Sequence, residues 1–275
     1  MPDFEFRQVD VFTVVPLNGN PLAVVIGADA LPDAEMMAFA SWTNLSETAF
    51  LLRPVHPDAD YRVRIFTPAS ELPFAGHPTL GSCHVWLSIG GSPKRAEIIQ
   101  ECGAGFIRIR RGGERLAFAA PGGEQSDVAP ETLARIAAAL RIPASAIVAA
   151  RWLGQAPAWG AVMLASRAEV LAVQPDYGAM AGLEIGVVAP SGGDETQFEV
   201  RAFAPDLGVR EDPVTGSLNA GLARWLIGAS KAPARYIAAQ GTCIGREGRI
   251  YVEQSGPDIW IGGHSVTCIT GVLTL

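Results

Sequence analysis

A short motif that occurs twice, about half a chain apart, constrains the fold of this 275-residue sequence more than any other feature. The segment FAGHPTLGS at 74–82 has a counterpart in EDPVTGS at 211–217, and the two align as HPTLGS over DPVTGS. In that alignment His77 and Asp212 correspond, 135 positions apart (212 − 77). Each copy follows a strand-like run ending in Phe-x-Pro and opens a helix-like run. The chain is therefore predicted to be built from two related halves.

The two motif copies also predict where a ligand binds. Each copy opens a helix, and the first turn of a helix carries unpaired N–H groups and a partial positive charge. If the two copies face each other, both helix starts point into one shared cleft, which favours a small anion, most simply a carboxylate. Gly76 in the first copy, and Thr215, Gly216 and Ser217 in the second, are the candidate substrate-binding residues because they supply backbone N–H and hydroxyl donors.

Residue periodicity predicts an α+β chain that is rich in strands. Helices are expected over 33–42, over 78–87 behind Pro78, over 131–140 and over 215–227, and the helix behind Pro78 is expected to be enclosed by strands. The predicted strands are 4–13, 22–26, 48–52, 61–66, 97–101, 106–110, 116–119, 147–153, 160–165, 184–189, 197–203, 235–239, 249–254, 258–262 and 265–274.

The polar, Gly-rich stretch GGEQSDVAPE at 122–131 is the predicted crossover between two domains. We expect an N-terminal domain over 1–120 and a C-terminal domain over 121–264. The last strand, about 265–275, could return to the first domain.

Composition narrows the function classes. With 49% hydrophobic and 18% charged residues the chain can bury a sizeable core. A net charge of −7 and a pI near 5.2 oppose a nucleic-acid surface. We expect no membrane association, because no apolar stretch is long enough to span a bilayer and no leader is visible, and hence a cytoplasmic protein. Cys83, Cys102, Cys243 and Cys268 lack CxxC spacing, so neither a zinc site nor a disulfide framework is expected.

Glu47, in NLSETAF, is the candidate proton-transferring residue. It stands at the rim of an apolar run, where desolvation would raise its pKa and suit it to proton transfer near neutral pH. The structural alternative is a solvent-facing strand residue or a cap. His77 could equally be a hydrogen-bonded structural residue, and Asp212 a helix cap. Their pairing in the two motif copies favours the functional interpretation.

Five segments together resemble the PhzF family, the phenazine-biosynthesis isomerase-like proteins. They are DVFT with GNPLAVV at 10–25, NLSETAFL at 44–51, FTPASELPFAGHPTLGS at 66–82, EDPVTGSLNAG at 211–221, and QGTCIGREGRIYV with IGGHSVTCITGVL near the end. The resemblance runs over nearly the whole chain. It implies the diaminopimelate epimerase fold, two pseudo-symmetric domains that each wrap a β-barrel-like sheet around a central helix, with the active site between them and commonly a homodimer.

The resemblance also implies roles for the motif residues. The glutamate of the NLSET motif, Glu47, would be the general acid/base, with His77 and Asp212 as supporting polar groups and Ser217, Gly76 and Gly216 holding the substrate. Epimerases of this fold exchange the α-proton between two cysteines at the helix starts, whereas this chain has none there, which disfavours a two-thiol racemase. No metal triad and no dinucleotide-type glycine loop is visible in the sequence, so neither metal nor cofactor is expected.

Three hypotheses remain open from the sequence. The first is a cofactor-independent isomerase that uses Glu47 to move a proton between carbons of a small carboxylate-bearing substrate. The second is an amino-acid epimerase or racemase of the same fold, in which Asp212 or His77 would supply the second base. The third is a non-catalytic ligand-binding or interaction protein that retains the cleft.

Overall fold

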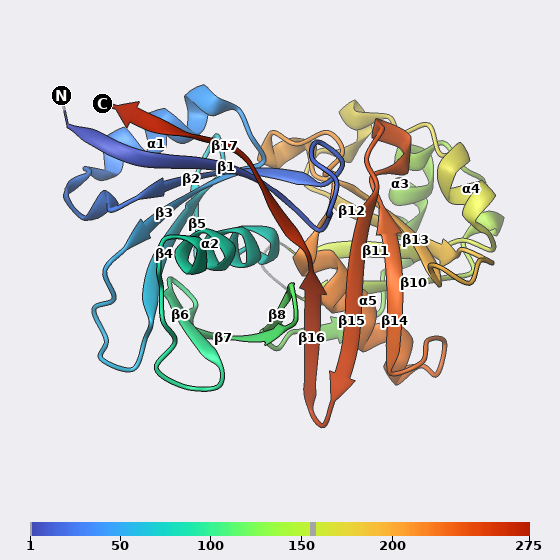
Figure 1. Ribbon diagram of the computed structural model, residues 1–275. Helices are drawn as coiled ribbons and strands as arrows, with labels where there is room; N and C mark the ends of the chain where they lie inside the picture. Colours follow the sequence, from blue (N-terminus) through green and yellow to red (C-terminus); the bar gives the residue numbers. More distant parts are fainter. Residues whose placement is uncertain (1, 155–157) are drawn as a thin grey trace. The chain divides into compact units, whose positions relative to one another are not determined.

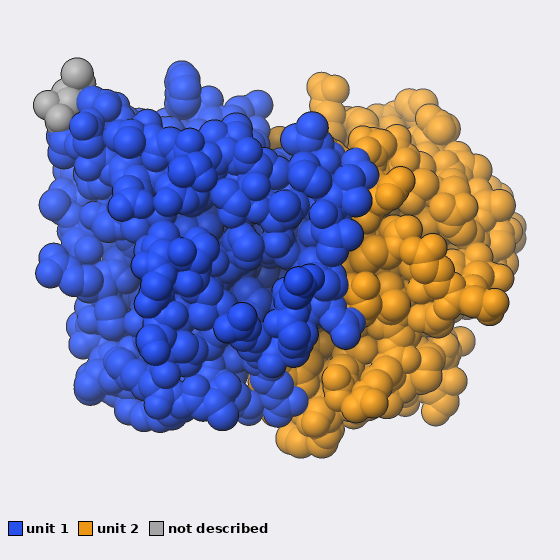
Figure 2. Space-filling view, in the orientation of Figure 1, with its two compact units in different colours: residues 1–119, 262–275 blue, residues 120–261 orange. Residues whose placement is uncertain are grey.

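The computed structural model describes residues 2–154 and 158–275 and has a mixed α+β fold with many strands and few helices. The chain forms two compact units, coloured separately in Figure 2. The first unit is Met1–Ala119 together with Gly262–Leu275, and the second is Ala120–Ile261.

The helices and strands follow the predicted order. The first unit contains β1 (Asp3–Val11), β2 (Asn20–Ile26), α1 (Asp33–Thr43), β3 (Glu47–Leu52), β4 (Tyr61–Phe66), β5 (Glu71–Leu72), α2 (Gly76–Ser88), β6 (Ile98–Cys102), β7 (Gly105–Gly112), β8 (Arg115–Ala119) and β17 (Ser265–Thr274). The second unit contains β9 (Glu124–Ser126), α3 (Pro130–Leu140), β10 (Ala149–Gly154), β11 (Trp159–Met163), α4 (Arg167–Ala172), β12 (Glu184–Pro190), β13 (Phe198–Phe203), α5 (Gly216–Gly228), β14 (Arg235–Gln240), β15 (Gly248–Ser255) and most of β16 (Asp258–Gly263).

In the first unit a curved sheet surrounds α2. Strand β1 pairs antiparallel with β2 and β17, β2 runs parallel to β3, and β3 and β4 are antiparallel. The sheet continues through β6, β7 and β8, and the strands bend around α2 (Figure 1). Every residue from Gly76 to Cys83 is buried, as expected for a helix with strands on several sides. The prediction of a helix enclosed by strands is confirmed.

Strand β3 shows how the sheet separates two layers. Phe50 packs with Phe39 of α1 in a cluster on the outer face, and the Thr48 hydroxyl lies 3.1 Å from that of Thr43 at the end of α1. Because side chains alternate along a strand, Glu47 and Ala49 point to the opposite, inner face, where α2 lies. The apolar run after Glu47 is thus buried on both faces, and α2 and α1 each cover one of them.

The second unit has the same arrangement, with a sheet around α5. Strands β12 and β13 are antiparallel, β13 runs parallel to β14, and β14 pairs antiparallel with β15. Helix α3 packs its buried Ile136 and Leu140 against a cluster that includes Val187 and Phe203 of this sheet. Helix α4 was not predicted, since its six residues are too few to show a helical period. The predicted crossover contains the short strand β9, which pairs with β10.

The structure corrects the register of the repeat. Helices α2 and α5 both have 13 residues and begin at Gly76 and Gly216, 140 positions apart (216 − 76). In this register His77 corresponds to Ser217, the second residue of each helix. Asp212 lies four residues before α5, so the expectation that His77 and Asp212 occupy equivalent positions is wrong. The sequence alignment matched HPTLGS with DPVTGS because the two segments share residue types. The backbone conformation that starts each helix does not follow that match.

Candidate active site

Glu47, His77 and Asn20 meet on the inner face of the first unit. The Oε2 atom of Glu47, the first residue of β3, lies 3.5 Å from Nδ1 of His77, the second residue of α2. The same Nδ1 lies 3.4 Å from the side-chain amide nitrogen of Asn20, the first residue of β2. The His77 side chain is 3% exposed and that of Glu47 is 16% exposed. The Glu47 side chain is therefore partly exposed, whereas the imidazole beside it is buried.

Burial controls the charge of His77. Desolvation lowers the pKa of this imidazole to about 3, against a smaller opposing contribution from a backbone hydrogen bond at Pro21. The ring is thus neutral at neutral pH. At 3.5 Å its contact with Glu47 is longer than an ordinary N–H···O hydrogen bond, and with a neutral ring it is not an ion pair between two charged groups. A neutral ring can donate from Nδ1 to a carboxylate, or accept at Nδ1 from a carboxylic acid.

The starts of α2 and α5 lack side-chain caps. Ala75 and Thr215 are the N-cap residues, both extended, and neither side chain accepts a hydrogen bond from its helix. Gly76 and Gly216 are the first helical residues. The first-turn N–H groups of each helix are therefore not occupied by a capping side chain, which leaves each unit with a helix start suited to an anion.

In the second unit the Thr215 side chain serves Asp212 instead of capping the helix. Its hydroxyl donates a hydrogen bond of 2.6 Å to Oδ2 of Asp212. The amide N–H of Asp212 donates to the carbonyl of Ala202 in β13, at 2.9 Å. Asp212 is thereby held by the sheet on one side and by the residue preceding α5 on the other. The structure brings together these two residues that the sequence singled out.

A buried ion pair anchors the segment that carries Asp212. Arg201, in β13, donates from Nε and Nη2 to the two carboxylate oxygens of Glu211, at 2.9 and 2.8 Å, and both side chains are 5% exposed. Its Nη1 donates to the carbonyls of Val170 and Val173. Because the pair is bidentate and further satisfied by backbone carbonyls, it fixes the start of the segment with a definite orientation.

Ser217 is held by an aromatic side chain. The indole Nε1 of Trp159, the first residue of β11, donates to the Ser217 hydroxyl oxygen at 3.2 Å. Trp159 is buried, whereas Ser217 is half-buried. The hydroxyl proton of Ser217 is left to be donated elsewhere, since the indole can only donate.

Sequence reasoning missed four residues that contact the predicted site residues of the two units. They are Asn20, Trp159, Asn219 and Gln240. Asn20 and Gln240 stand inside motifs, GNPLAVV and QGTCIGREGRIYV, but an amide side chain by itself carries no chemical signal. Their importance comes from contacts with His77 and with Thr215, which are distant in sequence.

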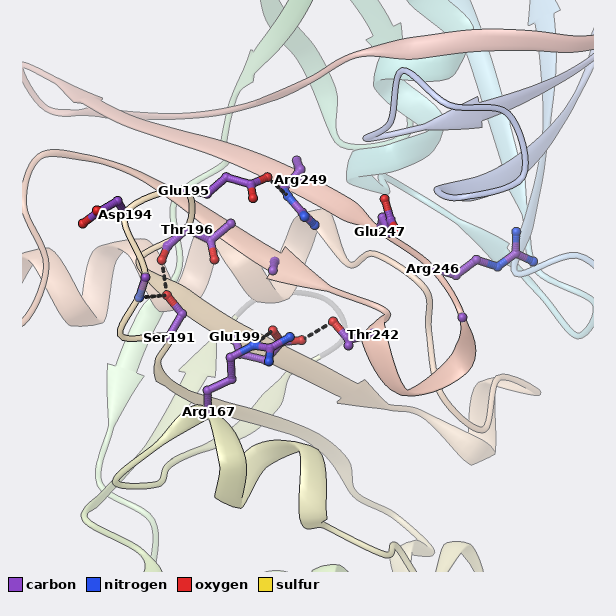
Figure 3. A pocket seen from close by; sticks show the side chains of 13 residues that line it. Arg167, Ser191, Asp194, Glu195, Thr196, Glu199, Thr242, Arg246, Glu247 and Arg249 are labelled. Carbon is purple, nitrogen blue, oxygen red and sulfur yellow. Dashed lines mark hydrogen bonds and ion pairs between the residues drawn. The ribbon is translucent and has the colours of Figure 1, made fainter.

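A pocket of about 610 Å³ in the second unit is lined by other residues (Figure 3). Its lining is polar, and four of its charged residues form two ion pairs. Arg167 donates from Nε to the buried carboxylate of Glu199 at 2.9 Å, Thr242 donates to the other oxygen at 2.6 Å, and Arg249 pairs with Glu195. None of the predicted site residues lines it. The pocket therefore takes no part in the chemistry considered below.

Two further findings concern the described part of the chain. Within residues 2–154 and 158–275, no three His, Cys, Asp or Glu side chains gather closely enough to hold a metal ion. In the same ranges no helix is both long and apolar enough to cross a membrane.

Comparison with known proteins identifies the family. The sequence model of the phenazine biosynthesis-like (PhzC-PhzF) family matches residues 9–271. The chain is 36% identical to antisense-enhancing sequence 1 of Schizosaccharomyces pombe, over 98% of this chain and 99% of that protein. It is 34% identical to trans-2,3-dihydro-3-hydroxyanthranilate isomerase of Pseudomonas aeruginosa, over 90% and 89%.

A solved structure agrees with the fold. The PhzF-family protein of Bacillus anthracis superimposes with a TM-score of 0.87 over 100% of both chains, at 22% identity. Taken with the match over residues 9–271, the chain belongs to the PhzF family of phenazine biosynthesis-like proteins and is an isomerase.

Proposed function

We propose that this isomerase moves a proton between two carbons of a small carboxylate-bearing substrate, with Glu47 as the single general acid/base. The observation that carries the proposal is the pairing of a partly exposed Glu47 with a buried, neutral His77 at 3.5 Å. A carboxylate takes the proton from one carbon, the electron pair shifts along a conjugated system, and the resulting carboxylic acid returns the proton to another carbon. The enol that forms then tautomerises to a ketone, with no net oxidation.

His77 is proposed to hydrogen-bond to Glu47 in both protonation states of the glutamate. When Glu47 is a carboxylate, Nδ1–H of the neutral ring donates to it. When Glu47 is protonated, the other tautomer accepts the acid proton at Nδ1. The Asn20 amide nitrogen lies 3.4 Å from the same Nδ1, whose single lone pair in the accepting tautomer takes one donor at a time, either the Glu47 acid or the Asn20 amide. A permanently charged imidazolium would instead stabilise only the carboxylate and slow the return of the proton.

The substrate carboxylate is proposed to bind the uncapped helix starts. The N–H groups at Gly76 and Gly216 and the Ser217 hydroxyl would hold it and stabilise the charge that develops during proton transfer. A preorganised donor of this kind typically lowers the reaction barrier by about 3 kcal/mol. Asp212, oriented by Thr215, is proposed to polarise a group of the substrate.

The name of the Pseudomonas aeruginosa relative suggests the substrate class, a cyclic, conjugated amino acid such as trans-2,3-dihydro-3-hydroxyanthranilate. No cofactor enters the proposed step. We further propose a homodimer, as the family resemblance implies, and a cytoplasmic location, which suits four cysteines that are all free thiols.

The test is proton exchange in deuterated water with trans-2,3-dihydro-3-hydroxyanthranilate as the probe, followed by NMR. Glu47→Gln keeps the shape of the side chain and removes the exchangeable carboxyl group, so exchange should fall by about 100-fold or more while binding of a carboxylate analogue changes little. The matched control is Glu35→Gln on α1, where the carboxylate is exposed and far less constrained. Circular dichroism should show both variants folded.

The outcomes separate the candidate functions. Exchange with a shifted double bond supports the isomerase mechanism. Exchange with stereoinversion of an amino acid would indicate an epimerase, for which Asp212 would have to be the second base. A folded Glu47→Gln variant with near-wild-type exchange would move the catalytic role away from Glu47, first to Asp212.

A further inference from the structure

A buried glutamine at the end of β14 clamps the segment from Asp212 to α5. Gln240 is fully buried, and its Oε1 accepts from the Thr215 backbone N–H at 3.1 Å and from Nδ2 of Asn219 at 2.9 Å. Its Nε2 donates to the Asp212 carbonyl at 3.0 Å and to the Thr215 hydroxyl at 2.8 Å. All four hydrogen-bonding positions of the amide are therefore used, which is the arrangement that best offsets burial of a polar group.

The amide sets the direction of a hydrogen-bond relay. A hydroxyl has one proton, and the Thr215 oxygen already accepts from Nε2 of Gln240, which can only donate. The Thr215 proton is thus directed to Oδ2 of Asp212, at 2.6 Å. The chain Gln240 to Thr215 to Asp212 stabilises the Asp212 carboxylate and fixes which of its oxygens is engaged. An acceptor in place of the Gln240 amide nitrogen would draw the Thr215 proton away from Asp212.

The first unit has a glutamine at the corresponding position after its central helix, but its chain of hydrogen bonds ends on a different kind of acceptor. Gln100 lies 24 positions after the first residue of α2, as Gln240 lies 24 after that of α5 (100 − 76 and 240 − 216), and it is also fully buried. It accepts from the Tyr61 hydroxyl and donates to Thr79, whose hydroxyl donates to the Ala75 carbonyl. That relay ends on backbone, so only Gln240 acts on a side chain of the candidate site.

We infer that Gln240 is a positioning residue for the proton-transfer reaction, which orients the Asp212 carboxylate through the Thr215 hydroxyl. This inference rests on the proposed function for its effect on turnover. The relay itself is a property of the second unit and can be tested without any substrate.

Gln240→Glu is the decisive variant because it changes the relay with pH while keeping the size of the side chain. The introduced carboxyl is buried beside the Asp212 carbonyl and near its carboxylate, so its pKa should lie above the usual glutamate value of about 4.3. Protonated, it retains one donor and much of the relay. Ionised, it only accepts, and the Thr215 proton turns toward it. Turnover relative to wild type should fall about tenfold or more between pH 5 and pH 8.

The matched control is Gln197→Glu. Gln197 is also in the second unit, and its amide bonds the backbone of Ile237 and Asp194, outside the candidate site. That variant should give a pH profile parallel to wild type. A purely structural role of Gln240 would lower activity at each pH only as far as the free energy of unfolding falls at that pH, which urea unfolding over the same pH range measures.

Two Thr215 variants keep the inference testable if Gln240→Glu does not fold. Thr215→Val removes the hydroxyl and should lower kcat about tenfold with little change in KM, and Thr215→Ser should restore most of it. The substrate-free measurement is the titration of the Asp212 carboxyl carbon by NMR in ¹³C-labelled protein, assigned with Asp212→Asn. Its midpoint should move up in Thr215→Val and in Gln240→Glu.

The two readouts distinguish the inference from the proposed function. If wild type does not turn over the probe, the proposed reaction fails for that substrate while the Asp212 titration still decides the relay. If Thr215→Val and Gln240→Glu leave the Asp212 midpoint unchanged, or if the Gln240→Glu pH profile parallels wild type, the inference is overturned.

Discussion

Replacing His77 by a side chain that cannot be charged should change how stability depends on pH. Burial lowers the pKa of His77 to about 3 in the folded protein, against an ordinary value of 6.5. Between these values the unfolded chain binds a proton that the folded protein does not. Stability is therefore fully retained above pH 6.5 and is lost as the pH falls from 6.5 toward 3.

The size of the effect follows from the shift. At pH 5, which is 1.5 units below 6.5, the loss is about 2 kcal/mol at 1.36 kcal/mol per unit. The limit below pH 3 is about 5 kcal/mol. His77→Asn lacks this titration, so the difference in unfolding free energy between wild type and variant should shift by about 2 kcal/mol in favour of the variant between pH 7.5 and pH 5.

Urea unfolding followed by circular dichroism at a series of pH values measures this difference. Using the difference between the two proteins cancels the other titrating groups, and any constant offset from lost contacts with Asn20 and Glu47 does not alter its pH dependence. A wild-type-to-variant difference that stays flat from pH 7.5 to 5 would refute the reasoning. So would ring-proton NMR signals of His77 that titrate near pH 6.5, because the ring would then not be neutral through desolvation.

Gly81→Ala in α2 should destabilise the first unit by about 1–3 kcal/mol in thermal or urea unfolding, because the new methyl group would meet side chains of β1 and β2 at 2.6–3.0 Å. The matched control is Gly228→Ala in α5, where the methyl group has open space, so that variant should be neutral or stabilising. Glu211→Gln leaves the Arg201 guanidinium buried without its counter-charge and should cost about 3–5 kcal/mol in urea unfolding. Replacing all four cysteines by serine should leave proton exchange nearly intact, since desolvation raises the pKa of the buried Cys83 thiol to about 12 and keeps it protonated; a folded quadruple variant without exchange would contradict the single-carboxylate mechanism.

Local patterns in the sequence were sufficient for most secondary structure. The β-branched runs with turn residues at their ends, such as 61–66 and 184–189, became β4 with the expected bounds and β12 with one more residue at its end. These elements were predictable because side-chain alternation, proline and glycine act within a few residues. Helix α4 and strand β9 were not predicted, because segments of six and three residues are too short to show a periodic pattern.

The sequence by itself also determined the family and singled out Glu47, because motifs and their order along the chain can be recognised from the sequence alone. Only the tertiary structure decided which residues lie in contact. Strand alternation on β3 turned Glu47 inward, where α2 presents His77 and β2 presents Asn20. The helix starts aligned the repeat at 140 positions instead of 135, and β14 delivered Gln240 to Thr215. These contacts join residues 25 or more positions apart, and the burial that keeps His77 neutral exists only once the sheet has closed around α2.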